Sequence, residues 1–261
     1  MKRIIGICSV GLCLVSCRSV REGDPAVSKS QNESTHTLLV ATPSQAVKLP
    51  KASASGLYPK HVDPFYNIQC DLLPGPDQAT FEKMVTSSGA DWPESFADLA
   101  ARHIGDTPFA VLALRDGVVE GWVRFYRAGS CNLRAPVTNR PPAGKALVIG
   151  AAVCTDELSR DTVRSMIEEA VQQAKRLGLT EIYAIASPDI RAYASWCNQF
   201  MLEDYAACGF EVVERTPAVQ DSALYDMANG AHGTKVQSSV REDGITAPYT
   251  TSYCLVKKKC E

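Results

Sequence analysis

The sequence lacks both repeated long hydrophobic runs and an excess of charge of one sign. Only one continuous apolar stretch occurs in its 261 residues, at the extreme N-terminus, which excludes a protein with several membrane spans. The 27 basic and 29 acidic residues give a net charge of −2, so no overall field attracts a nucleic acid, and we expect no nucleic-acid partner. A hydrophobic fraction of 45% excludes a wholly disordered chain and is enough to build a core.

Several catalytic and metal-binding motifs are also missing. The chain contains no Gly-x-Ser-x-Gly elbow, no Gly-x₄-Gly-Lys-Ser/Thr phosphate loop and no paired-histidine metal motif. Its four histidines are scattered, and no two cysteines have the spacing of a zinc site. The sequence therefore predicts no metal cofactor and favours neither a serine hydrolase nor a nucleoside triphosphatase.

Cysteine is the one unusual residue type that is well represented, with ten copies. Cys8 and Cys13 lie in the N-terminal apolar stretch, and the remaining cysteines after residue 17 are odd in number, so they cannot all pair within one chain. The seven cysteines after residue 17 are Cys70, Cys131, Cys154, Cys197, Cys208, Cys254 and Cys260. Several of them, namely Cys154, Cys197 and Cys208, lie in segments typical of apolar core, and most of the seven are expected to be buried thiols, with one or two unassigned bridges possible.

The N-terminus predicts export. Lys2 and Arg3 precede an apolar stretch from Ile4 to Val15, which is too short for a transmembrane helix and fits a signal peptide over residues 1–16. The box Leu14-Val15-Ser16-Cys17 resembles that of bacterial lipoproteins, and this resemblance implies that Cys17 becomes the lipidated first residue. The alternative is an ordinary signal peptide beside an incidental Cys17.

This reading also predicts a location and a division into segments. A lipidated Cys17 would anchor the chain to a membrane, in the bacterial periplasm, at the outer membrane or on the cell surface. Residues 17–57 are rich in Ser, Thr, Gln, Pro and Ala, and predict a flexible tether. We expect the ordered domain to occupy residues 58–261.

Hydrophobic periodicity predicts an alternation of strands and helices in this domain. The clearest helix carries Val163, Met166, Ile167, Ala170, Val171, Ala174 and Leu177 on one face and ends at Gly178. A longer helix is expected from Ser187 to about Cys208 and a long loop from Pro217 to Tyr249. Two further helices are expected at 77–87 and 93–103, and the expected strands are 65–73, 109–114, 118–127, 146–154, 180–186, 210–214 and 251–257. This order predicts a single α/β domain, a mixed sheet with helices on both faces.

One stretch resembles a known superfamily. Asn198, Tyr205, Gly209 and Phe210 have the spacing of the closing signature of the GNAT acyltransferases, although Met201 stands where a small residue is usual. The expected order of elements, from Phe65 to Lys257, is similar to that of the same superfamily. The resemblance implies a GNAT-like fold and the transfer of an acyl group from acyl-CoA to an amine.

The resemblance also implies roles for individual residues. Tyr205 would be the general acid that protonates the leaving thiolate, and Asn198 would contact the cofactor arm. Ala151, Ala152 and Val153 would line a gap between two splayed strands, where a β-bulge frees backbone groups for the pantetheine arm of acetyl-CoA or another acyl-CoA.

The segment that would hold the cofactor pyrophosphate departs from the superfamily pattern. Its glycine-rich loop is replaced by Leu158-Ser159-Arg160-Asp161-Thr162-Val163-Arg164-Ser165, and neither possible register retains a glycine. Asp161 would repel a pyrophosphate, whereas Arg160 and Arg164 could bind it directly. The strand 146–154 carries no carboxylate to act as a general base, which leaves Glu120 on the preceding hairpin as a candidate.

Three functions remain open at this point. The first is an exported, lipid-anchored N-acetyltransferase that acts on an unidentified amine of a small molecule or protein. The alternative is a catalytically inactive GNAT-fold lipoprotein that binds a ligand or partner in the same cleft. Export favours the alternative, because a periplasm or cell surface has no known supply of acyl-CoA. The third and least favoured is a transferase that uses an acyl donor other than acyl-CoA, such as the aminoacyl-tRNA or acyl carrier protein used by some members of the superfamily, because export separates the chain from these donors.

Overall fold

The structure of the chain is a computed structural model. It describes residues 36–52, 62–65, 97–98, 100–101, 104–130, 133, 137–154, 158–187 and 190–261. The chain divides into two units, Met1–Glu33 and Ser34–Glu261, and all of the described residues lie in the second. The expected signal peptide, Cys17, the expected helix 77–87 and all but the first residue of the expected strand 65–73 lie outside the described residues, and those predictions stay untested. Of the expected helix 93–103, the structure describes residues 97–98 and 100–101, which are helical.

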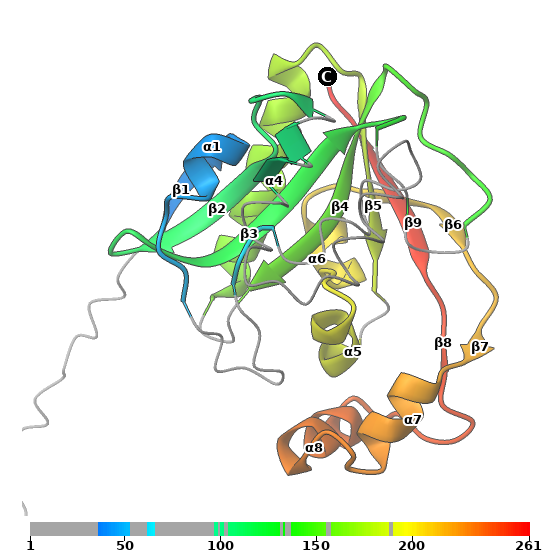
Figure 1. Cartoon of the computed structure of the whole chain (residues 1–261). Helices are drawn as coiled ribbons and strands as arrows, with labels where there is room; N and C mark the ends of the chain where they lie inside the picture. Colours follow the sequence, from blue (N-terminus) through cyan, green and yellow to red (C-terminus); the bar gives the residue numbers. More distant parts are fainter. Residues whose placement is uncertain are drawn as a thin grey trace, which may run out of the picture. The chain divides into compact units, whose positions relative to one another are not determined.

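A seven-stranded mixed sheet forms the centre of the second unit (Figure 1). Its strands follow the order β1-β2-β3-β4-β5-β9-β6, in which only β4 and β5 run parallel to each other. The strands are β1 (Thr37–Ala41), β2 (Ala110–Arg115), β3 (Val118–Arg127), β4 (Ala146–Cys154), β5 (Glu181–Ala186), β6 (Glu211–Arg215) and β9 (Cys254–Lys259). The expected α/β class with a mixed sheet is confirmed.

Helices lie on both faces of this sheet. The side chains of α4 pack on one face against β2, β3 and β4, and α6 packs beside α4 on that face. The opposite face is covered by a second core that includes Ala46 of α1, Trp122 and Phe109. The helices that the structure bounds are α1 (Pro43–Ala46), α4 (Arg160–Arg176), α5 (Arg191–Trp196), α6 (Leu202–Ala207), α7 (Ser222–Ala228) and α8 (Thr234–Glu242).

The predicted periodic helix is α4. Its side chains from Val163 to Ala174 on the apolar face are buried, and Ser159 caps its start by accepting a hydrogen bond from the Thr162 amide at 3.1 Å. Gly178, with φ +68°, follows the end of the helix in the left-handed conformation that glycine adopts without strain. Local signals therefore sufficed to define both ends of α4.

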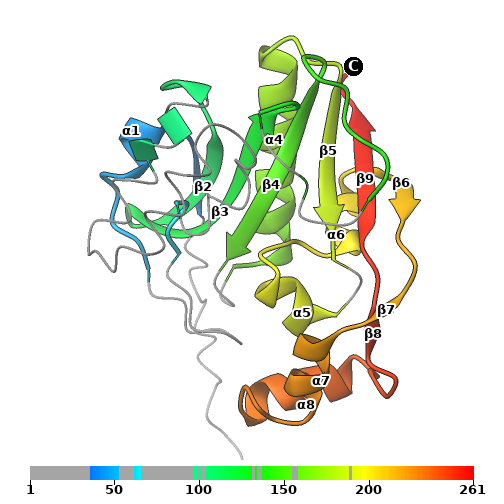
Figure 2. The same ribbon diagram turned by 45° about the vertical axis from the view of Figure 1, so that its right-hand side comes forward.

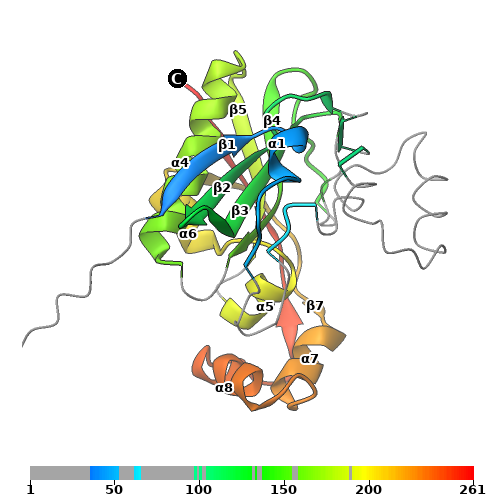
Figure 3. The ribbon, with the colours of Figure 1, turned by 60° about the vertical axis from the view of Figure 1, so that its left-hand side comes forward.

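Part of the predicted tether belongs to the sheet, and the boundary at residue 57 is wrong. Strand β1 pairs with β2 along its whole length, from Thr37 opposite Leu114 to Ala41 opposite Ala110 (Figure 3). Leu38 and Val40 pack against the core on the α4 side, while Leu39 packs against the opposite core. Three apolar residues cannot build a core of their own, but in a strand at the sheet edge they are buried against the cores that the rest of the sheet already forms.

The helix expected from Ser187 to Cys208 is two short helices, α5 and α6, separated by an extended segment. Asn198 interrupts it with φ +54°, a left-handed conformation that asparagine tolerates better than most residues. The amides of Asn198 and Gln199 still bond to carbonyls at the end of α5, but the carbonyls of Asn198 and Phe200 accept hydrogen bonds from the amides of Ala152 and Ser187. Met201 also forms a bridge with Ser187. These long-range bonds outweigh the local preference for a helix.

The segment expected to be a long loop, Pro217 to Tyr249, contains regular structure. It includes β7 (Val219–Gln220), α7 and α8, and β7 pairs with β8 (Thr250–Thr251). Figure 2 shows α7 and α8 beside each other next to α5. Their buried side chains Leu224, Met227, Val236 and Val240 form one small core with Ile190 and Tyr193.

None of the helices in the described part of the chain is long and apolar enough to cross a membrane.

Candidate functional site

The strands β4 and β5 separate halfway along, and this is where the site begins. They pair from Ala146 to Ile149 of β4, and the register of β3 against β4 then slips by one residue at Gly150. A bulge of this kind bends a strand and leaves an unpaired backbone group. The resemblance implied a bulge here, before Ala151, Ala152 and Val153.

The backbone groups beyond the bulge are bonded to the chain itself. The amide of Ala152 donates a hydrogen bond to the carbonyl of Asn198 at 2.9 Å. Ser187, which follows β5, donates its amide to the carbonyl of Phe200 at 3.1 Å and accepts a bond from the amide of Leu202 at 3.0 Å. The segment Asn198–Met201 therefore links β4 to the chain after β5 across the gap.

A cavity of about 760 Å³ lies beside this segment. Its walls come from the end of β4, the start of α4, α5, the start of α6 and one face of α8. Three of the residues predicted to bind a cofactor, Ala152, Val153 and Arg160, line it together. Among the described residues that form its walls, Ala151, Arg164, Asn198 and Tyr205 do not occur.

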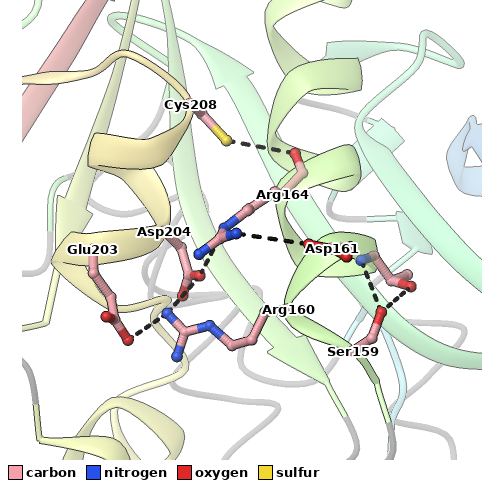
Figure 4. Close-up of polar contacts among 8 residues, drawn as sticks. Ser159, Arg160, Asp161, Arg164, Glu203, Asp204 and Cys208 are labelled. Atoms are coloured by element: carbon pink, nitrogen blue, oxygen red, sulfur yellow. Dashed lines mark hydrogen bonds and ion pairs between the residues drawn. The ribbon is translucent and has the colours of Figure 1, made fainter.

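The two arginines predicted to bind a pyrophosphate are engaged with carboxylates (Figure 4). Arg160 forms ion pairs with Glu203 and, at 2.7 Å between Nη2 and Oδ1, with Asp204. Arg164 lies 3.8 Å from the same Asp204 oxygen and 3.6 Å from Asp161. This network joins the start of α4 to the start of α6, and its acidic members lie where the anion was expected.

Asp204 is a site residue that the sequence analysis missed. Its side chain is only 5% exposed, and it lines the cavity. Burial raises the pKa of its carboxyl above the ordinary value, although the neighbouring Arg160 opposes that shift. The available signal was a carboxylate in the first turn of a helix, which is common for structural reasons and does not by itself indicate a site.

The predicted general acid, Tyr205, is enclosed by the core. Its ring packs against Phe200 and Phe210, with centroid distances of 6.4 and 5.2 Å, and is 1% exposed. Burial raises the pKa of the Tyr205 hydroxyl above that of an ordinary tyrosine. Phe200 lines the cavity and also contacts Tyr205, so it lies between the cavity wall and the core that holds the tyrosine.

The other residues of the signature, Asn198, Gly209 and Phe210, determine the path of the backbone. Asn198 is buried and holds the left-handed turn described above. Gly209 has φ +78° at the end of α6, and the buried Phe210 precedes β6. Gly209 therefore ends α6, and Phe210 leads the chain into β6.

The candidate base Glu120 is held in another cluster. Its carboxylate lies 2.8 Å from Nε2 of His36 and 3.3 Å from Arg115. The cluster ties the residue before β1 to the β2–β3 hairpin, and Glu120 is not among the described residues that line the cavity. Its position supports a structural rather than a catalytic role.

The described part of the chain holds no group of three or more His, Cys, Asp or Glu side chains that could bind a metal. Within it, Cys197, Cys208, Cys254 and Cys260 take part in no disulfide, and burial raises the pKa of Cys208 to about 11. Cys70 and Cys131 lie outside the described residues, so the prediction of one or two disulfides stays open.

A search of protein-family models finds no match to this chain, and neither does a search of the curated proteins. Solved structures similar to it are acetyltransferases. One is yncA of Salmonella typhimurium, described as an acetyltransferase with its cofactor acetyl-CoA (12% identity, 87% of this chain, 95% of that chain, TM-score 0.46). A second is the acetyltransferase of the GNAT family from Streptococcus pneumoniae (12%, 87%, 99%, TM-score 0.44). A third is aminoglycoside 6'-acetyltransferase type Ii (11%, 71%, 85%, TM-score 0.37). At such low identities and TM-scores, none of these likenesses assigns an activity to this chain.

Proposed function

We propose that this chain is an exported, lipid-anchored protein that binds a small ligand in a cleft of its acetyltransferase-like sheet and does not transfer acyl groups. The observation that carries the proposal is the hydrogen bond from the Ala152 amide to the Asn198 carbonyl at 2.9 Å. In the superfamily that the sequence resembles, a pantetheine arm takes the place beside this strand. In this chain the segment Asn198–Met201 takes it, so an acyl-CoA would have to break the bonds to Ala152 and Ser187.

The start of α4 supports the same proposal. A pyrophosphate binds best to uncapped amides at a helix N-terminus, but the Thr162 amide is already bonded to Ser159. Arg160 is paired with two carboxylates, and one of them, Asp204, is almost wholly buried. Binding a pyrophosphate there would separate these ion pairs and place like charges close together.

The position of Tyr205 argues against acid catalysis. A general acid must come within hydrogen-bond reach of the leaving group. Tyr205 is 1% exposed and packs against Phe200 and Phe210 instead of lining the cavity.

The cavity itself supports ligand binding. Its volume of about 760 Å³ lies in the usual range for small-molecule sites, roughly 300–1,000 Å³. Apolar side chains such as Val153 and Phe200 share its walls with charged and hydroxyl-bearing residues. Such a mixture provides burial for a ligand and polar groups that select it.

Titration of the full-length chain with acetyl-CoA, followed by thermal unfolding, tests the proposal. We expect no change in the midpoint temperature up to millimolar ligand. A ligand that binds only the folded state adds about 2.7 kcal/mol at a hundredfold excess over its Kd, which corresponds to roughly 5–10 °C in a domain of this size. A saturable rise of that size would refute the proposal.

A test of anchoring is separate from the test of binding. We expect the chain to incorporate radiolabelled palmitate in a bacterial host and the Cys17→Ala variant to lose the label. Equal labelling of both proteins would exclude Cys17 as the lipidated residue.

One observation favours the N-acetyltransferase as a second candidate. Ala152, Val153 and Arg160, which the resemblance assigns to the donor, line one cavity beyond a bulge at Gly150. This candidate predicts saturable binding of acetyl-CoA, acetylation of an amine and loss of that turnover in Tyr205→Phe. The acetyl-CoA titration therefore separates the two functions.

A further inference from the structure

A buried amide in the cavity wall lacks a partner. Gln199 is 8% exposed and lines the cavity, and its Oε1 has no hydrogen-bond partner among the described residues. The backbone holds this residue in place, because its N–H donates to the carbonyl of Ala194 at 3.1 Å. A buried side-chain carbonyl is normally bonded, and its oxygen can only accept. The group that completes Oε1 is therefore an O–H or N–H donor of a ligand.

The neutral polar groups on the α8 wall are hydroxyls. Thr234, Ser238 and Ser239 of this helix line the cavity. Val236 and Val240 of the same helix are buried in the small core that α8 shares with α5 and α7, which fixes the orientation of the helix. A hydroxyl donates one hydrogen bond and accepts two. This wall can therefore bond to ligand groups of either kind.

The charges around the cavity balance. We count the charged residues of its lining, the ion-pair network of Figure 4 and the two neighbours of Glu242 in the chain. They comprise five cations (Arg160, Arg164, Arg191, Lys235 and Arg241) and five anions (Asp161, Glu203, Asp204, Glu242 and Asp243).

The cations of the lining are also engaged within the chain. Arg160 is paired with Glu203 and Asp204, and Lys235 has a partner of its own. Neither sign is therefore in excess for a charged ligand to neutralise. A charge that is buried without a partner is costly, so the cavity favours a neutral ligand.

Other walls of the cavity are apolar. Val153 at the end of β4, Val163 of α4 and Phe200 line it. A ligand in the cavity therefore meets apolar side chains on these walls and hydroxyls on α8. A pyranose sugar has the same division, because the C–H groups on the faces of its ring are apolar and the hydroxyls around its edge both donate and accept hydrogen bonds.

We propose that the cavity binds a neutral sugar. One sugar hydroxyl donates to Oε1 of Gln199, and others bond to the hydroxyls of Ser238 and Ser239. The C–H face of the ring packs against Val153 and Phe200. The inference names the class of ligand for the binding cleft and therefore rests on the proposed function.

Calorimetric titration of the full-length chain with glucose, galactose and mannose tests this inference. We expect at least one of the three to bind with a Kd below about 1 mM. The uronic acid and the 2-amino sugar derived from the best ligand provide an anion and a cation of nearly the same shape at about pH 6. Both should bind at least about tenfold more weakly, because their charge would be buried without a partner. No binding of any of the three sugars at roughly 10 mM, or equal affinity for the charged forms, overturns the inference.

Variants assign the sugar to its partners in the wall. Gln199→Met removes the acceptor at nearly constant side-chain length and should weaken binding of the best sugar about tenfold. Because Oε1 makes no hydrogen bond to the described part of the chain, its loss does not threaten folding. Ser238→Ala, at an exposed position, should weaken binding about threefold. An unchanged affinity in Gln199→Met also overturns the inference.

Each variant has a matched control. Gln172→Met makes the same substitution at an exposed position of α4, and Ser222→Ala removes an exposed hydroxyl from α7. Neither residue is among the described residues that line the cavity, and neither substitution should change the affinity.

Acetyl-CoA added to the same samples separates the two possible failures. If no sugar binds and acetyl-CoA gives no shift in thermal unfolding, only the sugar inference fails. If acetyl-CoA gives a saturable shift and no sugar binds, the proposed function fails as well.

Discussion

The ion pair between Arg160 and Asp204 can be tested by removing each partner in turn. Losing one partner of a fully buried pair costs about 3–5 kcal/mol. Asp204 is 5% exposed, but Arg160 is 37% exposed and is partly solvated, so we expect Arg160→Ala to lower the free energy of unfolding by about 1–2 kcal/mol. The second arginine, Arg164 at 3.8 Å, limits the loss.

The neutral variant Asp204→Asn provides the matched background. It removes the buried charge, so Arg160→Ala should then cost no more than about 0.5 kcal/mol, the usual limit for a surface substitution. A double-mutant cycle at pH 7, measured by urea unfolding, should give a coupling of about 1 kcal/mol. An equal cost of Arg160→Ala in both backgrounds would refute this reasoning, because Arg160 would then be available to a ligand phosphate.

The same pair predicts a pH dependence. Burial raises the pKa of Asp204, so between the unfolded and the folded pKa the native state binds more protons than the unfolded state. The contribution of Asp204 to stability is therefore complete below the unfolded pKa and is lost as the pH rises through the folded pKa. The stability of the parent chain relative to Asp204→Asn should fall as the pH is raised above about 4, and a flat difference would contradict the shift.

Three further changes test other parts of the structure. Ala41→Asp buries a carboxylate in β1 and should cost at least about 3 kcal/mol in urea unfolding, whereas the exposed Thr37→Asp control should change stability by less than about 0.5 kcal/mol. Hydrogen bonds from residues 138 and 139 lower the pKa of Glu214 to about 2. The contribution of Glu214 to stability is therefore present above about pH 4.5 and is lost as the pH falls toward 2. Glu214→Gln should remove this pH dependence when the free energy of unfolding is measured at decreasing pH. Tyr205→Phe should leave ligand binding unchanged in calorimetry, because the ring does not line the cavity.

Elements with a complete local signal could be predicted from the sequence. Asp116-Gly117 forms the turn between β2 and β3, and both of these residues have positive φ, which is why a two-residue hairpin is formed there. The apolar run that predicted β4 coincides with the strand, since β4 is buried in the centre of the sheet. In α4 the periodicity, the cap and the stop all agree.

The elements that were missed depend on partners far along the chain. Strand β1 is stabilised by β2, more than 60 residues later, and its own apolar run is too short to indicate a sheet. The break at Asn198 is stabilised by Ala152 and Ser187 rather than by a local breaker such as proline. The helices α7 and α8 have only two buried apolar side chains each, and these are buried because α5 provides the other side of their core.

The residues of the candidate site also fall into two groups, one that the sequence predicted and one that it did not. Ala152, Val153 and Arg160 were assigned together through the resemblance, and they do line one cavity. Gln199 and Asp204 gave no signal, because their importance arises from burial beside a cavity and not from a motif. The remaining assignments, including Cys17 and the roles of Asn198, Tyr205 and Arg164, stay predictions.

The break at Asn198 also explains how the backbone beyond the bulge of β4 finds its hydrogen-bond partners. A bulge at Gly150 leaves backbone groups of β4 that must find partners. The segment after α5 supplies such a partner to Ala152 of β4, and it also bonds to Ser187, which follows β5. Once these bonds are internal, no cofactor is needed to complete the sheet. The helices α5 and α8 form two walls of the cavity, and the polar side chains there, rather than the edge of β4, are left to select a ligand.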